Sequence, residues 1–104
     1  MNYQSTRNAA LTASSAEAIL NGLAPDGGLY TMLDFDWQRC LTLSTQGMAT
    51  EILCALLPDF THAEMEQLVH AAYTGKFETE DLTPTVPVGD FQVLELFRGP
   101  TSAF

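Results

Sequence analysis

Two histidines and one glutamate recur at intervals of four residues, and their types and spacing are the best suited in this chain to a metal ion: His62, Glu66 and His70. Four residues overshoot the 3.6-residue turn of a helix, so the first and last of these side chains differ in direction by about 80°. Structural zinc sites normally take ligands from more than one element. We therefore predict that the three residues lie on a solvent-facing helix and that the chain holds no metal.

Carboxylates are the next candidates for chemistry, because Asp34 and Asp36 lie close together in the sequence and Asp26 precedes them. General acid–base catalysis needs a partner group at a meaningful spacing, and no histidine or second carboxylate motif accompanies these residues. Loop acidity accounts for them. The sequence also contains no P-loop, GxGxxG, GxSxG or HExxH pattern.

The two cysteines, Cys40 and Cys54, are too far apart for a CxxC motif and too few for a disulfide scaffold. We predict buried free thiols, in keeping with a reducing compartment. The sequence has no apolar run near the roughly 20 residues that span a bilayer, and no secretion signal at its start. These features favour the cytoplasm.

Composition indicates a folded, acidic chain that does not suit binding to nucleic acids or anionic membranes. The 104 residues suit one small domain over residues 1–104, and 46% hydrophobic with 16% charged residues is typical of globular proteins. The formal net charge of −9 repels nucleic-acid phosphates and anionic lipid surfaces. We expect neither nucleic acid nor membrane as a partner.

Three helices are predicted from capping residues and apolar periodicity. The first covers residues 15–21, with Ser14 and Glu17 as a capping box and Ala16, Ile19, Leu20 and Leu23 as the apolar stripe. The second covers residues 45–57 between Ser44 and Pro58. The third covers residues 62–74, with Thr61 and Glu64 as a capping box, and its expected core stripe is Met65, Leu68, Val69 and Ala72. Residues 37–43 are ambiguous, although Trp37, Cys40 and Leu41 could share one helical face.

Extended segments are predicted at both ends. Residues 3–6 suit a short edge strand, residues 23–29 suit a tight turn, and the apolar residues on either side of Gly89 and Asp90 suit a β-hairpin. The expected fold class is α+β, a small and mostly helical domain with a short antiparallel sheet or hairpin.

Three segments of the sequence resemble signatures of the threonine synthase family. Residues 3–7 (YQSTR) and 22–30 (GLAPDGGLY) match the early part of the family pattern. Residues 94–104 (LELFRGPTSAF) are similar to its LELFHGPTxAF segment, after which the family has the lysine that binds pyridoxal phosphate. The order of the three matches is that of the family, so the chain resembles the amino-terminal domain of a threonine synthase.

That resemblance implies a pyridoxal-phosphate enzyme that converts O-phosphohomoserine and water into threonine and phosphate. Such chemistry needs an amine, and the only lysine, Lys76, lies in a loop sequence unlike the family's lysine motif. We expect an amino-terminal fragment that has no catalytic residue, binds no cofactor and is inactive alone, with the downstream catalytic domain of the parent chain as its partner. A stand-alone acidic protein-interaction module derived from such a domain is the alternative.

The resemblance places eight residues beside the active site of the parent enzyme: Arg7, Asp26, Gly27, Arg98, Gly99, Pro100, Thr101 and Phe104. Arg7 could bind a substrate phosphate or carboxylate in bidentate fashion, or pair with one of the 13 acidic side chains. The turn at Asp26 could likewise be plain turn geometry or a substrate contact. Arg98 stands where the family commonly has histidine, so that histidine's role is not carried over.

Separation from a parent chain usually exposes an apolar interface. The residues expected to form it are Phe91, Val93, Leu96, Phe97 and Phe104. Besides the downstream catalytic domain, we therefore expect a second partner for this face, namely another copy of the same chain.

Overall fold

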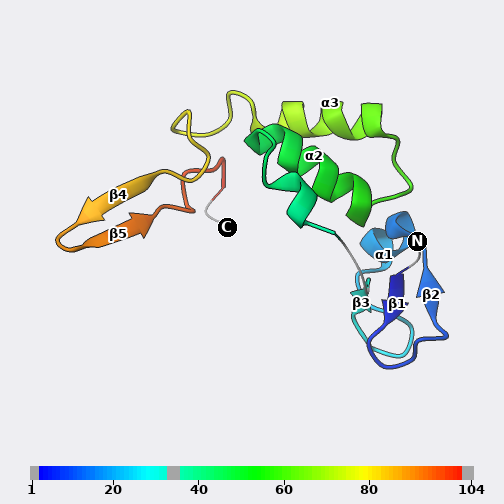
Figure 1. Ribbon diagram of the computed structural model, residues 1–104. Coiled ribbons are helices and arrows are strands. Elements are labelled where there is room, and N and C mark those ends of the chain that lie inside the picture. Colours follow the sequence, from blue (N-terminus) through cyan, green and yellow to red (C-terminus); the bar gives the residue numbers. More distant parts are fainter. Residues whose placement is uncertain (1–2, 33–35, 102–104) are drawn as a thin grey trace. The chain divides into compact units, whose positions relative to one another are not determined.

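The computed structural model describes residues 3–32 and 36–101 (Figure 1). The chain divides into two compact units, residues 1–67 and residues 68–104. Three α-helices, a short 3-10 helix and two small antiparallel sheets make up the described part. The predicted α+β class is confirmed.

The first unit contains a three-stranded antiparallel sheet in the order β2-β1-β3. The central strand β1 spans Tyr3–Ser5, β2 spans Thr12–Ala13 and β3 spans Tyr30–Thr31. The prediction of an edge strand at residues 3–6 was wrong in its position, because β1 is paired on both sides. The flanking strands have two residues each, which is too short for an alternating pattern to reveal them.

Helix α1 spans Ser15–Asn21 as predicted, and its capping box is present: Glu17 N–H donates to Ser14 Oγ and Ser14 N–H donates to the Glu17 carboxylate. The apolar stripe that indicated this helix is not its buried side. Ile19, Leu20 and Leu23 are exposed, whereas Ser15 is fully buried.

The anchoring of α1 explains which side is buried. Ala16 N–H donates to Asp59 Oδ2 at 2.7 Å, and Asp59 N–H donates to Ser15 Oγ at 3.4 Å. The contact that holds the helix is therefore polar and lies at its first turn, so the Ser15 side faces inward.

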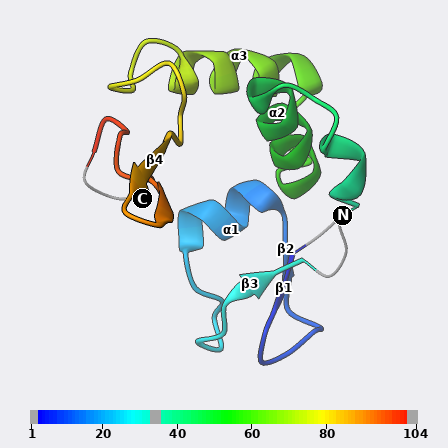
Figure 2. The same ribbon diagram turned by 60° about the vertical axis from the view of Figure 1, so that its left-hand side comes forward.

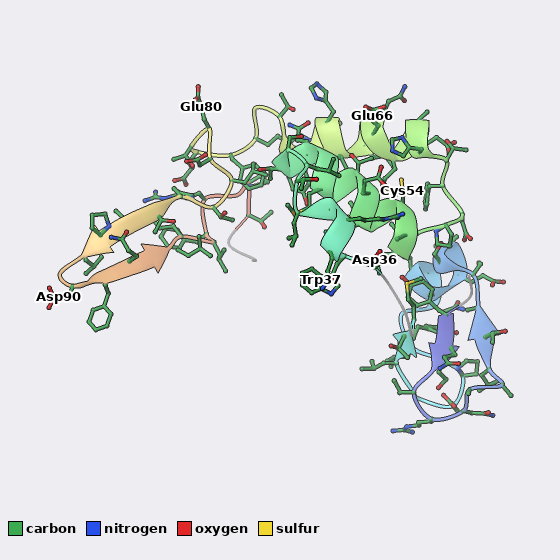
Figure 3. The ribbon with its side chains drawn as sticks, viewed as in Figure 1. Asp36, Trp37, Cys54, Glu66, Glu80 and Asp90 are labelled. Atoms are coloured by element: carbon green, nitrogen blue, oxygen red, sulfur yellow. The ribbon has the colours of Figure 1, made fainter. Side chains whose placement is uncertain are left out.

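Residues 36–57 form a 3-10 helix and a longer helix. The 3-10 helix η1 spans Gln38–Cys40 and lies within the segment that the sequence left ambiguous. Cys40 is buried, whereas Trp37 and Leu41 are exposed. Figure 3 labels Trp37. Helix α2 spans Thr45–Leu56 with Ser44 Oγ accepting from Gly47 N–H, which confirms the prediction to within one residue. Leu57 leaves the helical region because Pro58 disfavours helical geometry in the residue before it.

Helix α3 spans His62–Tyr73 and crosses from the first unit into the second. The capping box is confirmed: Thr61 N–H donates to Glu64 Oε2 and Glu64 N–H donates to Thr61 Oγ1. Of its expected core stripe, Met65 and Val69 are buried. Leu68 and Ala72 are exposed, so the helix uses half of that stripe.

The second unit contains the predicted hairpin. Strand β4 spans Thr85–Val88 and β5 spans Phe91–Leu94, with Val88 opposite Phe91, so Gly89 and Asp90 form the turn as expected. Asp90 lies at its tip in Figure 3. All eight strand residues are exposed.

The buried apolar residues among those described are few: Ala13, Ala24, Cys40, Met65 and Val69. No helix in residues 3–32 and 36–101 is long and apolar enough to cross a membrane.

Candidate functional site

Two of the three sequence signatures meet in the first unit. The end of β1 and the turn before β3 lie at the same end of the sheet in Figures 1 and 2. Thr6 N–H donates to the Leu29 carbonyl at 2.9 Å, and Leu29 N–H donates to Thr6 Oγ1 at 3.0 Å. The strand and turn are therefore held together by reciprocal hydrogen bonds.

Asp26 is the centre of this strand–turn cluster, which we define as Ser5, Thr6, Arg7, Asp26 and Gly28. The buried Ser5 hydroxyl lies 2.8 Å from Asp26 Oδ1 and 2.9 Å from Oδ2, and Gly28 N–H donates to Oδ1 at 2.9 Å. The Gly28 amide first, and then the Ser5 hydroxyl, hold the pKa of the Asp26 carboxyl below its usual value. Asp26 is thus a fixed carboxylate that stabilises a turn, which is a poor setting for a proton donor.

Two glycines allow this geometry. Gly27 has φ +77°, in the left-handed region that side chains disfavour. A Cβ on Gly28 would overlap Ser5 Oγ and would lie 3.0 Å from Asp26 Oδ1. The predicted tight turn over residues 23–29 is confirmed, with Leu23 and Leu29 bridged across it.

Arg7 follows β1 and is exposed. Its Nη1 donates to the main-chain carbonyl of Asp26 at 2.9 Å, and its main-chain N–H donates to Ser5 Oγ. Among the described residues Arg7 makes no ion pair with a carboxylate. The Arg7 guanidinium nevertheless attracts the Asp26 carboxylate, and this attraction is the smallest of the causes that lower the pKa of Asp26. The ion-pair interpretation is therefore met only in this weaker form.

Arg98, from the third signature, is bound very differently. Within the second unit its Nε and Nη2 donate to the two carboxylate oxygens of Glu95 at 3.2 and 3.1 Å. Its Nη1 donates to Glu78 Oε2 at 2.8 Å. Glu95 first, and then Glu78, raise the pKa of the Arg98 guanidinium.

The residues after Arg98 form the end of the described chain. Gly99 is half-buried, and a Cβ on it would lie 3.4 Å from Phe77 Cε1. Pro100 and Thr101 are exposed. Phe104, together with Asp34, lies outside the described residues.

The histidines and cysteines do not form a site in the described part of the chain. His62 Nε2 lies 2.9 Å from Glu51 Oε1 and Glu66 is exposed. No group of three histidine, cysteine or acidic side chains there is placed to hold a metal ion. Both cysteines are free, but Cys54 is only half-buried, so the prediction of two buried thiols was half right.

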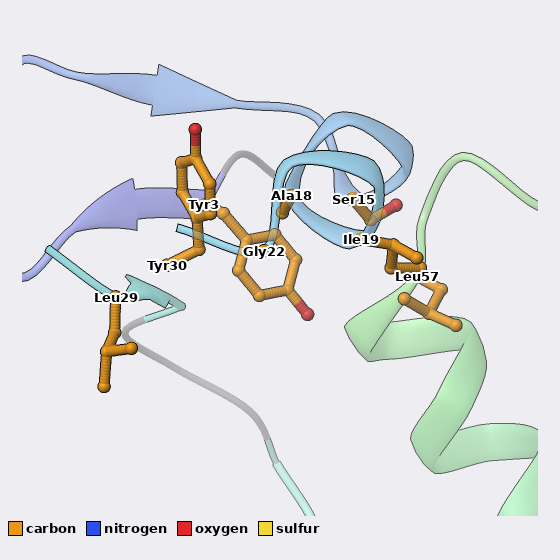
Figure 4. Close-up of a pocket in the computed structure, with 8 residues that line it drawn as sticks. All are labelled: Tyr3, Ser15, Ala18, Ile19, Gly22, Leu29, Tyr30 and Leu57. Atoms are coloured by element: carbon orange, nitrogen blue, oxygen red, sulfur yellow. The ribbon is translucent and has the colours of Figure 1, made fainter. Parts of the chain in front are cut away.

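Sequence reasoning missed a shallow cavity of about 320 Å³ in the first unit. Its lining, shown in Figure 4, is mostly apolar and carries no charged side chain: Tyr3, Ser15, Ala18, Ile19, Gly22, Leu29, Tyr30 and Leu57. The Tyr3 hydroxyl donates to the Leu56 carbonyl at 2.6 Å. A phosphorylated substrate would find no cation there. The sequence pattern that might have indicated it is the pair of tyrosines at the strand ends.

Comparison with known proteins identifies the class and the family. Residues 2–73 match the family model for the threonine synthase N terminus. The class of protein is therefore an amino-terminal region of an enzyme. The chain belongs to the threonine synthase family, and the resemblance noted in its three signatures is confirmed.

Individual relatives agree with this assignment. The chain is 34% identical over 119 aligned positions to threonine synthase of Corynebacterium glutamicum, covering 100% of this chain and 24% of the relative. It is 35% identical over 120 positions to that of Saccharomyces cerevisiae, covering 98% and 23%. A crystal structure of PLP-bound threonine synthase from Brucella melitensis is similar with a TM-score of 0.81 and 35% identity, covering 100% of this chain and 24% of that one.

The chain therefore spans about a quarter of the length of these relatives, and it matches their amino-terminal region. These comparisons give no support to a stand-alone interaction module.

Proposed function

We propose that this chain acts as the amino-terminal domain of a pyridoxal-phosphate-dependent threonine synthase, within which O-phosphohomoserine and water become threonine and phosphate. The observation that carries the proposal is the match of residues 2–73 to the threonine synthase N terminus. The pyridoxal phosphate in the similar Brucella melitensis protein supports the cofactor assignment for the whole enzyme.

This chain's residues do not by themselves fit the cofactor. Pyridoxal phosphate supplies an electron sink when it is bound, and it needs a lysine placed against it. Lys76 is the only lysine of the sequence, and it is exposed in the loop after α3. No catalytic step is therefore assigned to residues 1–104, and the partner that would supply the lysine is the downstream catalytic domain of a parent chain.

Arg7 is the residue that we propose for contact with an anionic group of the substrate. Its exposed guanidinium is oriented by the Asp26 carbonyl, and no described carboxylate oxygen lies within 4.0 Å of it as an ion pair. Asp26 and Gly27 would then act through the turn that holds Arg7. Gly99, Pro100 and Thr101 would lead the chain toward the active site.

The first experiment uses the isolated chain. The purified chain is mixed with pyridoxal phosphate alone and dialysed, and the visible absorbance that remains with the protein is recorded; phosphate release from O-phosphohomoserine is assayed in parallel against a protein-free blank, with intact Corynebacterium glutamicum threonine synthase as the positive control. We expect neither signal from the isolated chain. Appreciable phosphate release would contradict the proposal that the downstream domain is required.

The second experiment asks whether the chain can serve in an enzyme. The aligned amino-terminal quarter of the Corynebacterium glutamicum enzyme is replaced by this chain, and turnover of O-phosphohomoserine is measured. We expect a functional chimera. A chimera that folds and binds pyridoxal phosphate but never turns over would count against the assigned role.

The chimera also tests Arg7. We expect Arg7→Ala to lower kcat/KM for O-phosphohomoserine by about 10- to 100-fold, because a charge-assisted contact to the substrate is lost. Arg39→Ala is the matched control, since Arg39 is an exposed arginine whose nearest carboxylate, on Glu51, is 4.0 Å away. Equal kcat/KM values for the two variants would contradict the proposed contact between Arg7 and the substrate.

The proposal also covers the domain boundaries of the chain and its cellular compartment. Residues 1–104 would work as one amino-terminal domain, supported by matches that cover the whole chain. The cytoplasm is the proposed compartment, supported by two cysteines that remain free. Fractionation of cells that express the whole protein would test the latter.

A further inference from the structure

The Arg98 guanidinium donates to two carboxylates within the second unit through all three of its nitrogens. The bidentate pair with Glu95 uses Nε and Nη2, and the bond to Glu78 uses Nη1. This fork geometry is the strongest that an arginine can form with a carboxylate. The guanidinium also lies 5.0 Å above the ring of Phe97.

Main-chain hydrogen bonds reinforce the same connection. Glu78 N–H donates to the Arg98 carbonyl at 3.0 Å, and Glu95 N–H donates to the Pro84 carbonyl at 2.8 Å. Arg98 therefore joins the loop after α3 to the segment after β5 through both its side chain and its backbone.

The next residue rests on an aromatic pair. Gly99 lies beside the Phe77 ring, and an added Cβ would be in ordinary van der Waals contact with it at 3.4 Å. The Phe77 ring in turn packs on Tyr73, the last residue of α3, with centroids 5.9 Å apart. Residue 99 thus lies beside the Phe77 ring and directly follows a residue that is held by the charge cluster of Arg98, Glu78 and Glu95.

We infer that Arg98 is a positioning residue that sets the path of residues 99–101 through Glu78 and Glu95, and that it is not itself an anion-binding residue. One positive and two negative charges leave this cluster with a net charge of −1, which repels a phosphate or carboxylate. A substrate anion that approached Arg98 would also meet the two carboxylates already bound to it. The importance of this path for catalysis rests on the proposed function, whereas the connection itself does not.

The direct test is amide hydrogen exchange in the 104-residue chain, read by NMR at the Glu78 amide and expressed as a protection factor. We expect Arg98→Ala to lower this factor by about 3- to 10-fold, a partial loss because the Arg98 side chain is 34% exposed and solvent screens the pair. The α-proton shifts of Gly99 should move toward random-coil values as the Phe77 ring current is lost.

Titratable and conservative variants separate this role from a general loss of structure. In Arg98→His the Glu78 amide should be protected at pH about 5.5 and lose that protection by pH about 8, because imidazole is charged only below its pKa of about 6.5. The native chain, with its permanent charge, should show equal protection at both values. Arg98→Lys should retain part of the protection, since an ammonium group cannot form the fork.

Glu78→Gln and Arg39→Ala complete the set. Glu78→Gln should reproduce part of the Arg98→Ala effect, and Arg39→Ala should leave the Glu78 amide unchanged. The Gly22 amide, which donates to the Ala18 carbonyl at the end of α1, is the reference for loss of structure in the first unit in every sample. A Glu78 amide equally protected in native chain and Arg98→Ala would overturn the inference. So would perturbation of the Arg98 Nε signal by millimolar inorganic phosphate.

The outcomes distinguish this inference from the proposed function. A chimera without turnover would refute the enzyme role and leave the exchange result standing. Unchanged exchange would refute the Arg98 connection even in a chimera that makes threonine.

Discussion

At the scale of single residues, a buried hydroxyl determines the shape of the strand–turn cluster. Ser5 is 3% exposed, and its Oγ contacts both oxygens of Asp26 while accepting from Arg7 N–H. The serine thus joins the first signature of the sequence to the second. Its size matters too, because it occupies the space where a Gly28 side chain would lie.

The first prediction concerns this serine. Ser5→Ala should lower the free energy of unfolding by about 1–2 kcal/mol, since a buried hydrogen-bonding group is removed and its partners lose their contact. Urea denaturation followed by circular dichroism gives the value. Thr42→Ala, which removes a hydroxyl from an exposed threonine, is the control and should be close to neutral. Indistinguishable midpoints for the two variants would show that the Ser5 contact is unimportant.

At the scale of elements, helix α1 is held by a residue far away in the sequence. Asp59, in the loop between α2 and α3, accepts from the Ala16 amide, a donor at the first turn that has no partner within the helix. A negative charge at this end also interacts favourably with the helix dipole. The Ala16 amide, followed by Ser15, holds the pKa of the Asp59 carboxyl below its usual value.

The second prediction follows from this cap. Asp59→Ala should lower the thermal midpoint by a few degrees, because the N-terminal donor loses its acceptor. Asp59→Asn retains an acceptor and should have a smaller effect. Asp36→Ala removes an exposed carboxylate as a control for charge alone. A midpoint for Asp59→Ala no lower than that of Asp36→Ala would exclude the capping role.

The third prediction concerns acid. Four carboxylates that accept backbone amides in the first unit have lowered pKa values: Glu17, Asp26, Asp59 and Glu64. A native pKa below the unfolded value means that the unfolded chain binds more protons as the pH falls. The stabilisation is therefore complete above the unfolded pKa values of about 3.9–4.3, and is lost as the pH falls through the lower native values.

Urea midpoints measured from neutral pH down through this range should decline accordingly. The double variant Glu17→Gln and Glu64→Gln keeps both capping boxes with uncharged acceptors, so its decline should be shallower. An identical pH dependence in native chain and double variant would show that the capping carboxylates do not titrate differently on unfolding.

At the scale of the whole molecule, apolar surface is more abundant than buried core. The hairpin apolar face, which we define as Phe91, Val93, Leu96 and Phe97, has exposed fractions from 40% to 76%. A lone two-stranded hairpin is only marginally stable in water, so such a face needs a cover. In an intact threonine synthase the remaining three quarters of the chain could supply one.

The fourth prediction is self-association of the isolated chain through this face. Sedimentation velocity should show a concentration-dependent rise in apparent mass, and Phe91→Ser should weaken it because the most exposed of the four side chains is lost. Leu20→Ser, at an 85% exposed leucine on α1, is the matched control. A strict monomer at high concentration would contradict the prediction, and a stronger effect of Leu20→Ser would move the interface to α1.

The amino-acid sequence alone determined the local structure and the family. Ser14 with Glu17, Thr61 with Glu64, Pro58, and Gly89 with Asp90 each act within a few residues, so their chemistry sets helix ends and the hairpin turn wherever the chain goes. The three signatures gave the family for the same reason, since each is a continuous string. The placement of residues 99–101 and the site roles stay predictions.

Tertiary structure decided which groups meet and which faces are buried. Ala16 and Asp59 are 43 positions apart, Ser5 and Asp26 are 21 apart, and Arg98 and Glu78 are 20 apart. No local pattern encodes such pairs, because they depend on how separate elements pack. The exposure of Ile19 and Leu20 has the same origin: periodicity shows that a helix has an apolar face, but only its neighbours decide whether that face is covered.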